Sequence, residues 1–248
     1  MRRVAALYDV HGNLPALEAV LSEVDAVGVD LVVFGGDVAA GPLPAETIER
    51  LQGLERPSRF VMGNADRALV TTWDGGSAGA GEAAQALASA APLLSRPQRD
   101  FLAGFEPHLR LTVEGLGEVL FRHGSPRSED EIVTAATPDA VIEEMLAGVT
   151  EQVVVVGHTH MQFDRRVAGV RLVNAGSVGM PYGEPGAYWA LLGPNLELRR
   201  TEYDREAAIA RLRTSRWPGA ESFVAENVLS APSATEATEL FERMAGRA

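Results

Sequence analysis

The sequence contains no cysteine and no lysine, and it has no long run of apolar residues. Without cysteine the protein can form no disulfide, no thiolate zinc site and no thiol nucleophile. No apolar stretch approaches the roughly 18 residues that a membrane-spanning helix requires. The first residues, Met1-Arg2-Arg3-Val4, also lack the apolar core and the cleavage site of a secretory signal peptide. We therefore expect a cytoplasmic protein that does not enter a membrane.

Positive charge comes from arginine alone. The 22 basic residues are all arginine, and 34 acidic residues bring the net charge to −12. An acidic surface repels the phosphates of nucleic acids and the headgroups of anionic membranes, so we expect no binding to long duplex nucleic acid. A small phosphorylated substrate at a locally cationic site is compatible with this charge.

The first third of the chain predicts a parallel sheet flanked by helices. Short apolar runs predict strands at residues 4–8, 31–34 and 59–62, and helical periodicity predicts helices at residues 14–27 and 44–54. Asn13 is placed to cap the first helix, with Pro15 in its first turn. A β-α-β-α-β order implies parallel strands with helices against the faces of the sheet.

From residue 108 onward the pattern changes to paired strands. We expect strands at residues 109–113, 118–123, 152–156, 163–167, 170–173, 188–192 and 196–201, with a helix at 138–147. The predicted fold is an α/β protein, a four-layer α/β/β/α sandwich of two mixed sheets. We assign residues 1–203 to this domain. The helices of residues 204–248 either extend the domain or form a dimer contact, so a homo-oligomer stays open.

Residues 71–105 interrupt this pattern with glycines and an alanine-rich segment. One interpretation is a surface excursion. The other is a helical lid over a site at the strand ends, because connections near strand ends often carry substrate contacts.

Four of the five histidines lie in short polar blocks that follow apolar runs. The blocks are Asp9-Val10-His11, Gly36-Asp37, Gly63-Asn64, Arg122-His123-Gly124 and Gly157-His158-Thr159-His160. Residues two apart on a strand point the same way, and ligands gather at the carboxyl ends of parallel strands. The blocks therefore favour a metal site that is built from loops. The fifth histidine, His108, falls outside the blocks and is interpreted as structural.

Each block alone also has an ordinary structural explanation. Asn64 can form an Asx turn that caps the following helix, and Asp66 can place charge at the N-terminus of that helix. The helical zinc-protease motif His-Glu-x-x-His is absent. The shared position at strand ends is what makes the blocks informative together.

This order of blocks resembles the calcineurin-like metallophosphoesterase superfamily, and most closely its small prokaryotic phosphodiesterase branch. The resemblance covers residues 1–200, and Asn174-Ala175-Gly176-Ser177 is similar to an Asn-Pro-Gly-Ser segment of that branch. Carried over by position, the resemblance implies a first ion bound by Asp9, His11 and His160, a second bound by Asn64, His123 and His158, and Asp37 as the bridging ligand. Oxygen and nitrogen donors without sulfur suit two divalent ions of manganese, iron, zinc, nickel or cobalt.

The resemblance implies hydrolysis of phosphoesters by a metal-bridging hydroxide that attacks phosphorus in line. The implied catalytic set is His11, Asp37, Asn64 and Asp66, the last as a hydrogen-bond acceptor that orients a ligand. Two divalent ions offset by Asp9, Asp37 and a hydroxide leave about one positive charge, which suits a phosphodiester monoanion.

One departure from the family pattern sharpens the substrate prediction. Many members have a histidine after the asparagine, where it protonates the leaving group, but this chain has Ala65. The prediction is a phosphodiesterase that prefers activated leaving groups. A phosphomonoesterase or protein phosphatase, and a nucleotide-polyphosphate hydrolase, are alternatives. A catalytically weak protein-binding scaffold is an alternative of another class, and the complete ligand set counts against it.

Two further residues are candidates for contacts with a small phosphorylated substrate. Arg127 can hold a phosphate oxygen, or it is a solvated loop arginine. Tyr182 can border the pocket, or it lies outside it.

Overall fold

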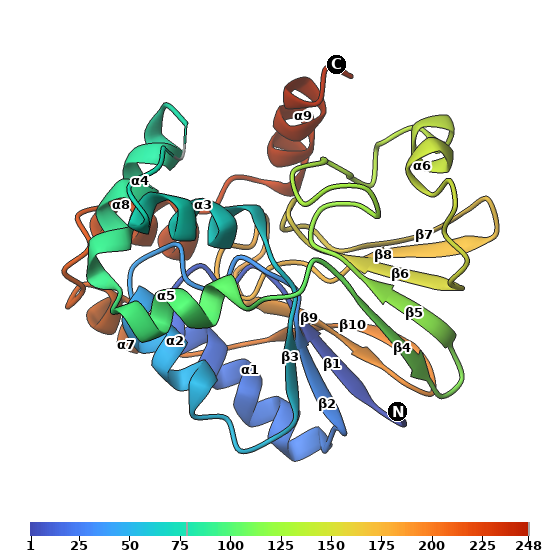
Figure 1. Cartoon of the computed structure of the whole chain (residues 1–248), viewed down its shortest axis with the longest axis horizontal. Helices are drawn as coiled ribbons and strands as arrows, with labels where there is room; N and C mark the ends of the chain where they lie inside the picture. Colours follow the sequence, from blue (N-terminus) through green and yellow to red (C-terminus); the bar gives the residue numbers. More distant parts are fainter. Residues whose placement is uncertain (78, 248) are drawn as a thin grey trace.

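The computed structural model describes residues 1–77 and 79–247. Two five-stranded sheets pack face to face, and helices cover their outer sides (Figure 1). The two sheets are mixed, and the predicted four-layer α/β/β/α sandwich is confirmed.

The first sheet carries the predicted parallel strands at its centre and one edge. Its strand order is β10-β9-β1-β2-β3. The strands are β1 (Val4–Leu7), β2 (Leu31–Phe34), β3 (Ser58–Phe60), β9 (Ala187–Leu192) and β10 (Leu196–Thr201). The strands β1, β2 and β3 run parallel, and β9 is antiparallel to both β1 and β10. The chain therefore leaves this sheet after β3 and returns at Ala187 to complete it.

The second sheet has the strand order β4-β5-β6-β8-β7. The strands are β4 (Leu109–Val113), β5 (Gly117–Phe121), β6 (Val153–Val156), β7 (Phe163–Val167) and β8 (Val170–Asn174). The central pairs β5–β6 and β6–β8 are parallel, whereas the edge pairs are antiparallel hairpins. The carboxyl ends of β5 and β6 therefore lie at the same edge of this sheet.

Alternate residues of each central strand enter different apolar layers, as the period of a strand requires. Val4 and Ala6 of β1 pack between the sheets, and Ala5 and Leu7 pack under the helices of the first sheet. In the continuous apolar strand β6 the odd-numbered valines face the first sheet and the even-numbered ones face outward. Three apolar layers therefore separate the four layers of secondary structure.

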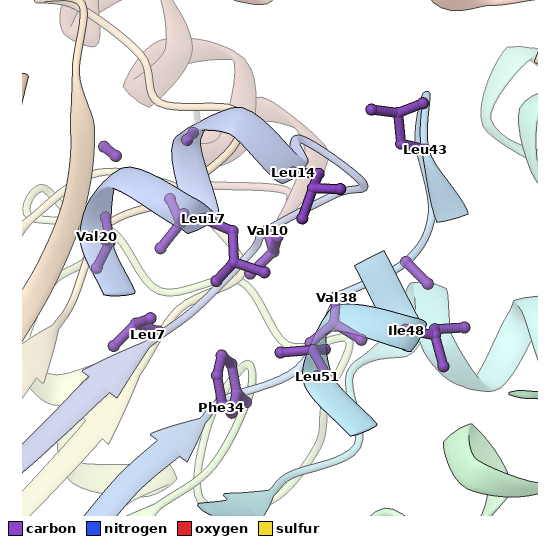
Figure 2. Close-up of a cluster of buried hydrophobic side chains, with 14 of the residues drawn as sticks. Leu7, Val10, Leu14, Leu17, Val20, Phe34, Val38, Leu43, Ile48 and Leu51 are labelled. Atoms are coloured by element: carbon purple, nitrogen blue, oxygen red, sulfur yellow. The ribbon is translucent and has the colours of Figure 1, made fainter. Parts of the chain in front are cut away.

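The outer side of the first sheet is covered by α1 (Leu14–Val27) and α2 (Pro44–Gln52). Figure 2 shows leucines and valines of α1 and α2 meeting Leu7 and Phe34 from the strands. The Asn13 side chain accepts a hydrogen bond from the backbone N–H of Ala16 and Pro15 lies in the first turn, so the predicted start of α1 is confirmed. On the second sheet, α6 (Asp139–Met145) buries Ile142 and Met145 against β6.

Of the predicted lid segment, residues 71–105, the described residues 71–77 and 79–105 include helices that belong to the helical layer of the first sheet. They comprise the end of α3 (Asn64–Trp73), α4 (Glu82–Ala90), the 3₁₀ turn η1 (Ala91–Leu93) and α5 (Arg96–Ala103). Leu87, Leu94 and Leu102 are buried in the core that α1 and α2 also line. Movement of the whole segment as a lid would expose these side chains, so the burial favours a fixed part of the layer.

The chain beyond residue 203 continues as α7 (Arg205–Leu212), α8 (Ala220–Phe223), the π-helix η2 (Val224–Leu229) and α9 (Ala234–Met244). Arg211 of α7 pairs with Glu18 of α1, and the Trp217 indole donates to the carbonyl of Ala86. In the part of the chain that the structure describes, no helix combines the length and the apolar character that crossing a membrane demands.

Candidate metal centre

Seven polar side chains converge where strands of both sheets end. Asp9, His11 and His160 form the first ligand group, and Asp37, His123 and His158 form the second. Within each group the ligand atoms lie within 4.8 Å of one another. Each group takes its aspartate from a loop of the first sheet and at least one histidine from a loop of the second. The site therefore exists only when the two sheets are packed together.

The backbone is held in an uncommon conformation at these positions. Asp9, His11, Asp37, His158 and His160 all have positive φ, between 46° and 65°. Among non-glycine residues of the described chain, only Ala168 shares this property. Left-handed backbone is unfavourable for residues other than glycine. Five such residues at one site indicate local backbone strain that the rest of the fold maintains and that orients these side chains.

Two glycines let the backbone approach the carboxylates closely. A Cβ atom on Gly63 would lie 2.1 Å from Oδ1 of Asp37, and one on Gly157 would lie 2.5 Å from Oδ2 of Asp9. These separations are shorter than any nonbonded contact that a side chain tolerates. The glycines of the Gly-Asn and Gly-His blocks are therefore structurally required next to the site.

Backbone carbonyls fix the tautomers of three histidines. The Nδ1 atoms of His11, His123 and His160 lie 3.1, 2.9 and 2.8 Å from the carbonyl oxygens of Ala40, Gly35 and Met180, respectively. A carbonyl oxygen only accepts, so each Nδ1 carries a proton. The Nε2 atom of each neutral ring then points into its ligand group with a free lone pair, which is how metal-bound histidines are usually held.

The first ligand group has the spacing and the chemistry of a cation site. The Nε2 atoms of His11 and His160 are 3.2 Å apart, and Oδ1 of Asp9 lies 3.3 Å from Nε2 of His160. Oδ1 of Asp9 is buried and accepts no hydrogen bond from the described residues. Two donors that each lie about 2.1 Å from one ion are about 3.0–3.4 Å apart. Without an ion, the lone pairs of these facing atoms repel one another. A divalent ion between them would attract all of them.

The second ligand group includes the amide of Asn64. Nε2 of His123 lies 3.0 Å from Oδ1 of Asn64 and 3.3 Å from Oδ2 of Asp37. The same Oδ2 lies 3.8 Å from Nε2 of His11, so the Asp37 carboxylate stands between the two groups. The structure thus brings together all seven residues that the resemblance implied.

The charges of the site shift the pKa values of its members strongly when no cation is bound. Burial lowers the pKa of His123, but the negative charges of Asp37 and Asp9 outweigh it and raise that pKa to about 10. Burial and the neighbouring charge of His123 lower the pKa of His158 to about 4. Burial raises the pKa of Asp37, whereas His123 and His11 lower it to about 2. Without metal, His123 therefore carries the positive charge that balances the aspartates.

Asp66 supports the Asp37 turn and does not enter either ligand group. Its buried carboxylate accepts hydrogen bonds from the backbone N–H groups of Asp37, Val38 and Gly63, at 2.7, 3.0 and 3.3 Å. Asp66 also lies in the first turn of α3, so the two explanations offered for it apply together. Burial and the charge of Asp37 raise the pKa of Asp66 to about 7.

Of the three other residues that the sequence singled out, Tyr182 borders the ligand groups, whereas Arg127 and His108 do not. The ring of Tyr182 stacks on His160 with centroids 5.6 Å apart. The Arg127 guanidinium instead pairs with Glu131 and donates to the carbonyl of Glu144, so the arrangement does not support a phosphate contact. His108 lies beside Arg110 and takes no part in the ligand groups.

Sequence reasoning assigned no role to Asn174 and Ser177, which the structure places directly behind the ligands. Asn174 donates to the carbonyl of Gly157 at 2.6 Å, and Ser177 donates to the carbonyl of Asp9 at 2.8 Å. Both side chains are buried. The only signal for them in the sequence was the similarity of the Asn-Ala-Gly-Ser segment to that of the phosphodiesterase branch.

Comparison with known proteins agrees with this geometry. The model of the calcineurin-like phosphoesterase superfamily domain matches residues 2–193. A metallophosphoesterase structure from Sphaerobacter thermophilus is similar to this chain with a TM-score of 0.70 and 28% identity, over 90% of this chain and 97% of that one. The hypothetical protein PH1004 from Pyrococcus horikoshii OT3 shares the fold with a TM-score of 0.79 and 21% identity, over 92% and 98% of the two chains.

Among curated proteins, the uncharacterized protein MJ0912 of Methanocaldococcus jannaschii is 26% identical over 237 residues, which cover 87% of this chain and 93% of that protein. The family match spans nearly all of both sheets and every residue of the two ligand groups. The chain belongs to the calcineurin-like phosphoesterase superfamily.

Proposed function

We propose that this protein hydrolyses phosphodiesters with two divalent metal ions, one in each ligand group. The observation that carries the proposal is the position of Asp37, whose Oδ2 lies 3.3 Å from His123 of its own group and 3.8 Å from His11 of the other. A carboxylate shared in this way suits two ions held close together. Such a pair supplies Lewis-acid activation of a phosphoryl group and lowers the pKa of a water molecule.

The residues of the chain contribute orientation and charge. The carbonyl partners of His11, His123 and His160 hold a proton on Nδ1, so Nε2 is the nitrogen that each neutral ring offers to a metal. Asp66 holds the backbone that carries Asp37. Asp9 and Asp37 leave a ligand set of low negative charge. A phosphodiester, which carries a single negative charge, balances two divalent ions in this set better than a dianionic monoester.

The residue after Asn64 supports a substrate with a good leaving group. Ala65 donates its backbone N–H to Oδ1 of Asp37 at 2.8 Å, but its methyl group has no proton to transfer. An alkyl leaving group requires protonation of the departing oxygen, whereas a nitrophenolate departs without it. We therefore infer a preference for diesters with good leaving groups.

The test uses metal-stripped protein with Mn²⁺, Ni²⁺, Co²⁺, Zn²⁺ or Mg²⁺ added back, and bis-p-nitrophenyl phosphate against p-nitrophenyl phosphate. We expect activity only with added metal, and a higher kcat/KM for the diester. Asp37→Ala should abolish it, while Asp130→Ala, at an exposed aspartate outside the ligand groups, should leave it unchanged. Equal kcat/KM for the two esters would contradict the diester preference, and wild-type activity of Asp37→Ala would contradict the two-ion site.

A further inference from the structure

We propose that the C-terminal strap, residues 231–247, is a positioning element that orients His160 and its loop for metal binding. The inference rests on the proposed metal centre. The strap contains α9, and it lies beyond residue 193, where the family match ends. In Figure 1, α9 lies beside the loop that leads from β5 to α6, over the edge of the second sheet. Three separate contacts join it to the loops that carry or support His158 and His160.

The first contact is a stack of three rings. The rings of Phe241 and Tyr182 meet edge to face, with centroids 5.9 Å apart and planes at 72°. Tyr182 in turn stacks on His160, with centroids 5.6 Å apart and planes at 21°. The loop that carries Tyr182 also provides the Met180 carbonyl, which lies 2.8 Å from Nδ1 of His160. The loop that carries Met180 and Tyr182 therefore contacts both the ring face and the Nδ1 atom of His160. Phe241 of α9 packs against Tyr182 and so supports this loop.

The second contact is polar and buried. Glu242 accepts hydrogen bonds from the hydroxyls of Thr134 and Thr137, at 2.7 and 2.8 Å, and pairs with Arg247. The neighbouring carbonyl of Val133 accepts from the hydroxyl of Thr159 at 2.9 Å. Thr159 lies between the two histidines of the Gly-His-Thr-His block. The strap therefore anchors the loop of Val133 and Thr134, and this loop in turn holds the loop that carries His158 and His160.

The third contact secures the start of the strap. The backbone N–H of Gly183 donates to the carbonyl of Pro232 at 2.9 Å, and the hydroxyl of Thr238 lies 3.4 Å from the Met161 sulfur. Met161 directly follows His160. The strap therefore supports the chain on both sides of His160. It contacts Met161 directly through Thr238, and it supports Thr159 indirectly through the loop that Glu242 holds.

The composition of α9 argues for positioning over simple packing. Its inner face carries Phe241, Thr238 and the buried Glu242, whereas Leu240 and Met244 remain 47% and 65% exposed. A buried carboxylate is costly unless its partners are present, so it specifies a register more than it adds stability. A helix that only shielded apolar surface would be expected to bury Leu240 and Met244 instead.

The test measures metal binding, because a positioning role should affect one ion selectively. Full-length metal-stripped protein is titrated with Mn²⁺ in a calorimeter and with Co²⁺ by visible absorption, and circular dichroism monitors folding. Phe241→Ala should weaken binding of the first-group ion about 10-fold, as loss of support behind a ligand commonly does. The second ion should change by less than about 2-fold. Leu240→Ala, on the exposed face of the same helix, is the matched control and should bind both ions as the wild type does.

The route through Tyr182 is tested by a double-mutant cycle. If Phe241 acts through Tyr182, then Phe241→Ala should have almost no further effect on the first ion in a Tyr182→Ala background. Phe241→Leu keeps the apolar volume, so it provides a folded variant if Phe241→Ala does not fold, and it should weaken the first ion by about 3-fold. Unchanged affinity for the first ion in both Phe241 variants, or equal weakening of both ions, would overturn the proposal. Failure of the wild-type protein to bind two ions would instead overturn the proposed function.

Discussion

The two ligand groups share one aspartate and two histidines each, with Asn64 added in the second, but they are supported differently. Each joins loops of both sheets. In the first group, both histidines donate through Nδ1 to a backbone carbonyl. In the second, only His123 does so, and within the described residues the His158 ring forms no hydrogen bond. The comparison teaches that similar ligands need not be equally preorganised, and it predicts a tighter ion in the first group.

The largest effect is expected where the two groups meet. Asp37→Asn keeps the shape of the side chain but removes the charge that stands between them. We expect kcat/KM for bis-p-nitrophenyl phosphate to fall about 10³-fold or more, with both ions bound more weakly, because charge at a bridging position supports both. Kinetics and metal titration check this, with Asp130→Asn as the control. Loss of one ion alone would show that Asp37 belongs to the second group only.

The next prediction compares one histidine from each group. His160→Ala should weaken one ion about 100-fold, whereas His158→Ala should weaken the other about 10-fold, because only His160 is held in place by a carbonyl and a stacked ring. Calorimetric titration of the two variants measures this difference. The predicted difference in preorganisation would be wrong if the two substitutions had equal effects.

The second ligand group should make the stability of the metal-free protein depend on pH. The pKa of His123 is raised to about 10 in the folded protein from an ordinary value of 6.5. The stability that its protonation adds is therefore fully present below pH 6.5 and is lost as the pH rises through about 10. We expect the Tm of the metal-free protein to fall by about 5 °C or more between pH 7 and pH 10.

Metal binding should reverse this trend, because an ion replaces the proton on His123 and binds more tightly at higher pH. Thermal unfolding with chelator and with Mn²⁺ gives the two profiles. A His123→Gln variant, whose side chain does not titrate, should flatten the metal-free profile. A profile that stays as steep in this variant would assign the proton to another group.

The smallest effect concerns the second group and its neighbour Ala65. Ala65→His would add a proton donor at the start of α3, next to Asn64. We expect kcat/KM for an alkyl monoester such as glycerol phosphate to rise about 10-fold, below the full effect of a tuned general acid. The kcat/KM for p-nitrophenyl phosphate should change little, because its leaving group departs without a proton. Thr71→His, on an exposed position of the same helix, is the control. No gain for the alkyl monoester would mean that the missing histidine does not limit the choice of substrate.

Much of the fold followed from local patterns. The apolar runs at the start of the chain and the Asn13 cap are local features, and the structure matches them closely, although β3 ends at Phe60 where the predicted strand extended to residue 62. The helix boundaries at residues 44–52 and 139–145 also lie inside the predicted ranges. Such features depend on neighbours within a few residues, so periodicity and capping chemistry determine them.

What the sequence determined by itself is which residues end the strands, and therefore which side chains are available as ligands. Only the tertiary structure decided their partners: Asp9 meets His160 across 151 positions of sequence, and Phe241 supports Tyr182 from the last helix. It also directed Arg127 toward Glu131 and buried Leu87, Leu94 and Leu102 in the core. The physical reason is that these contacts form when separate sheets and helices pack, and no local preference encodes that packing.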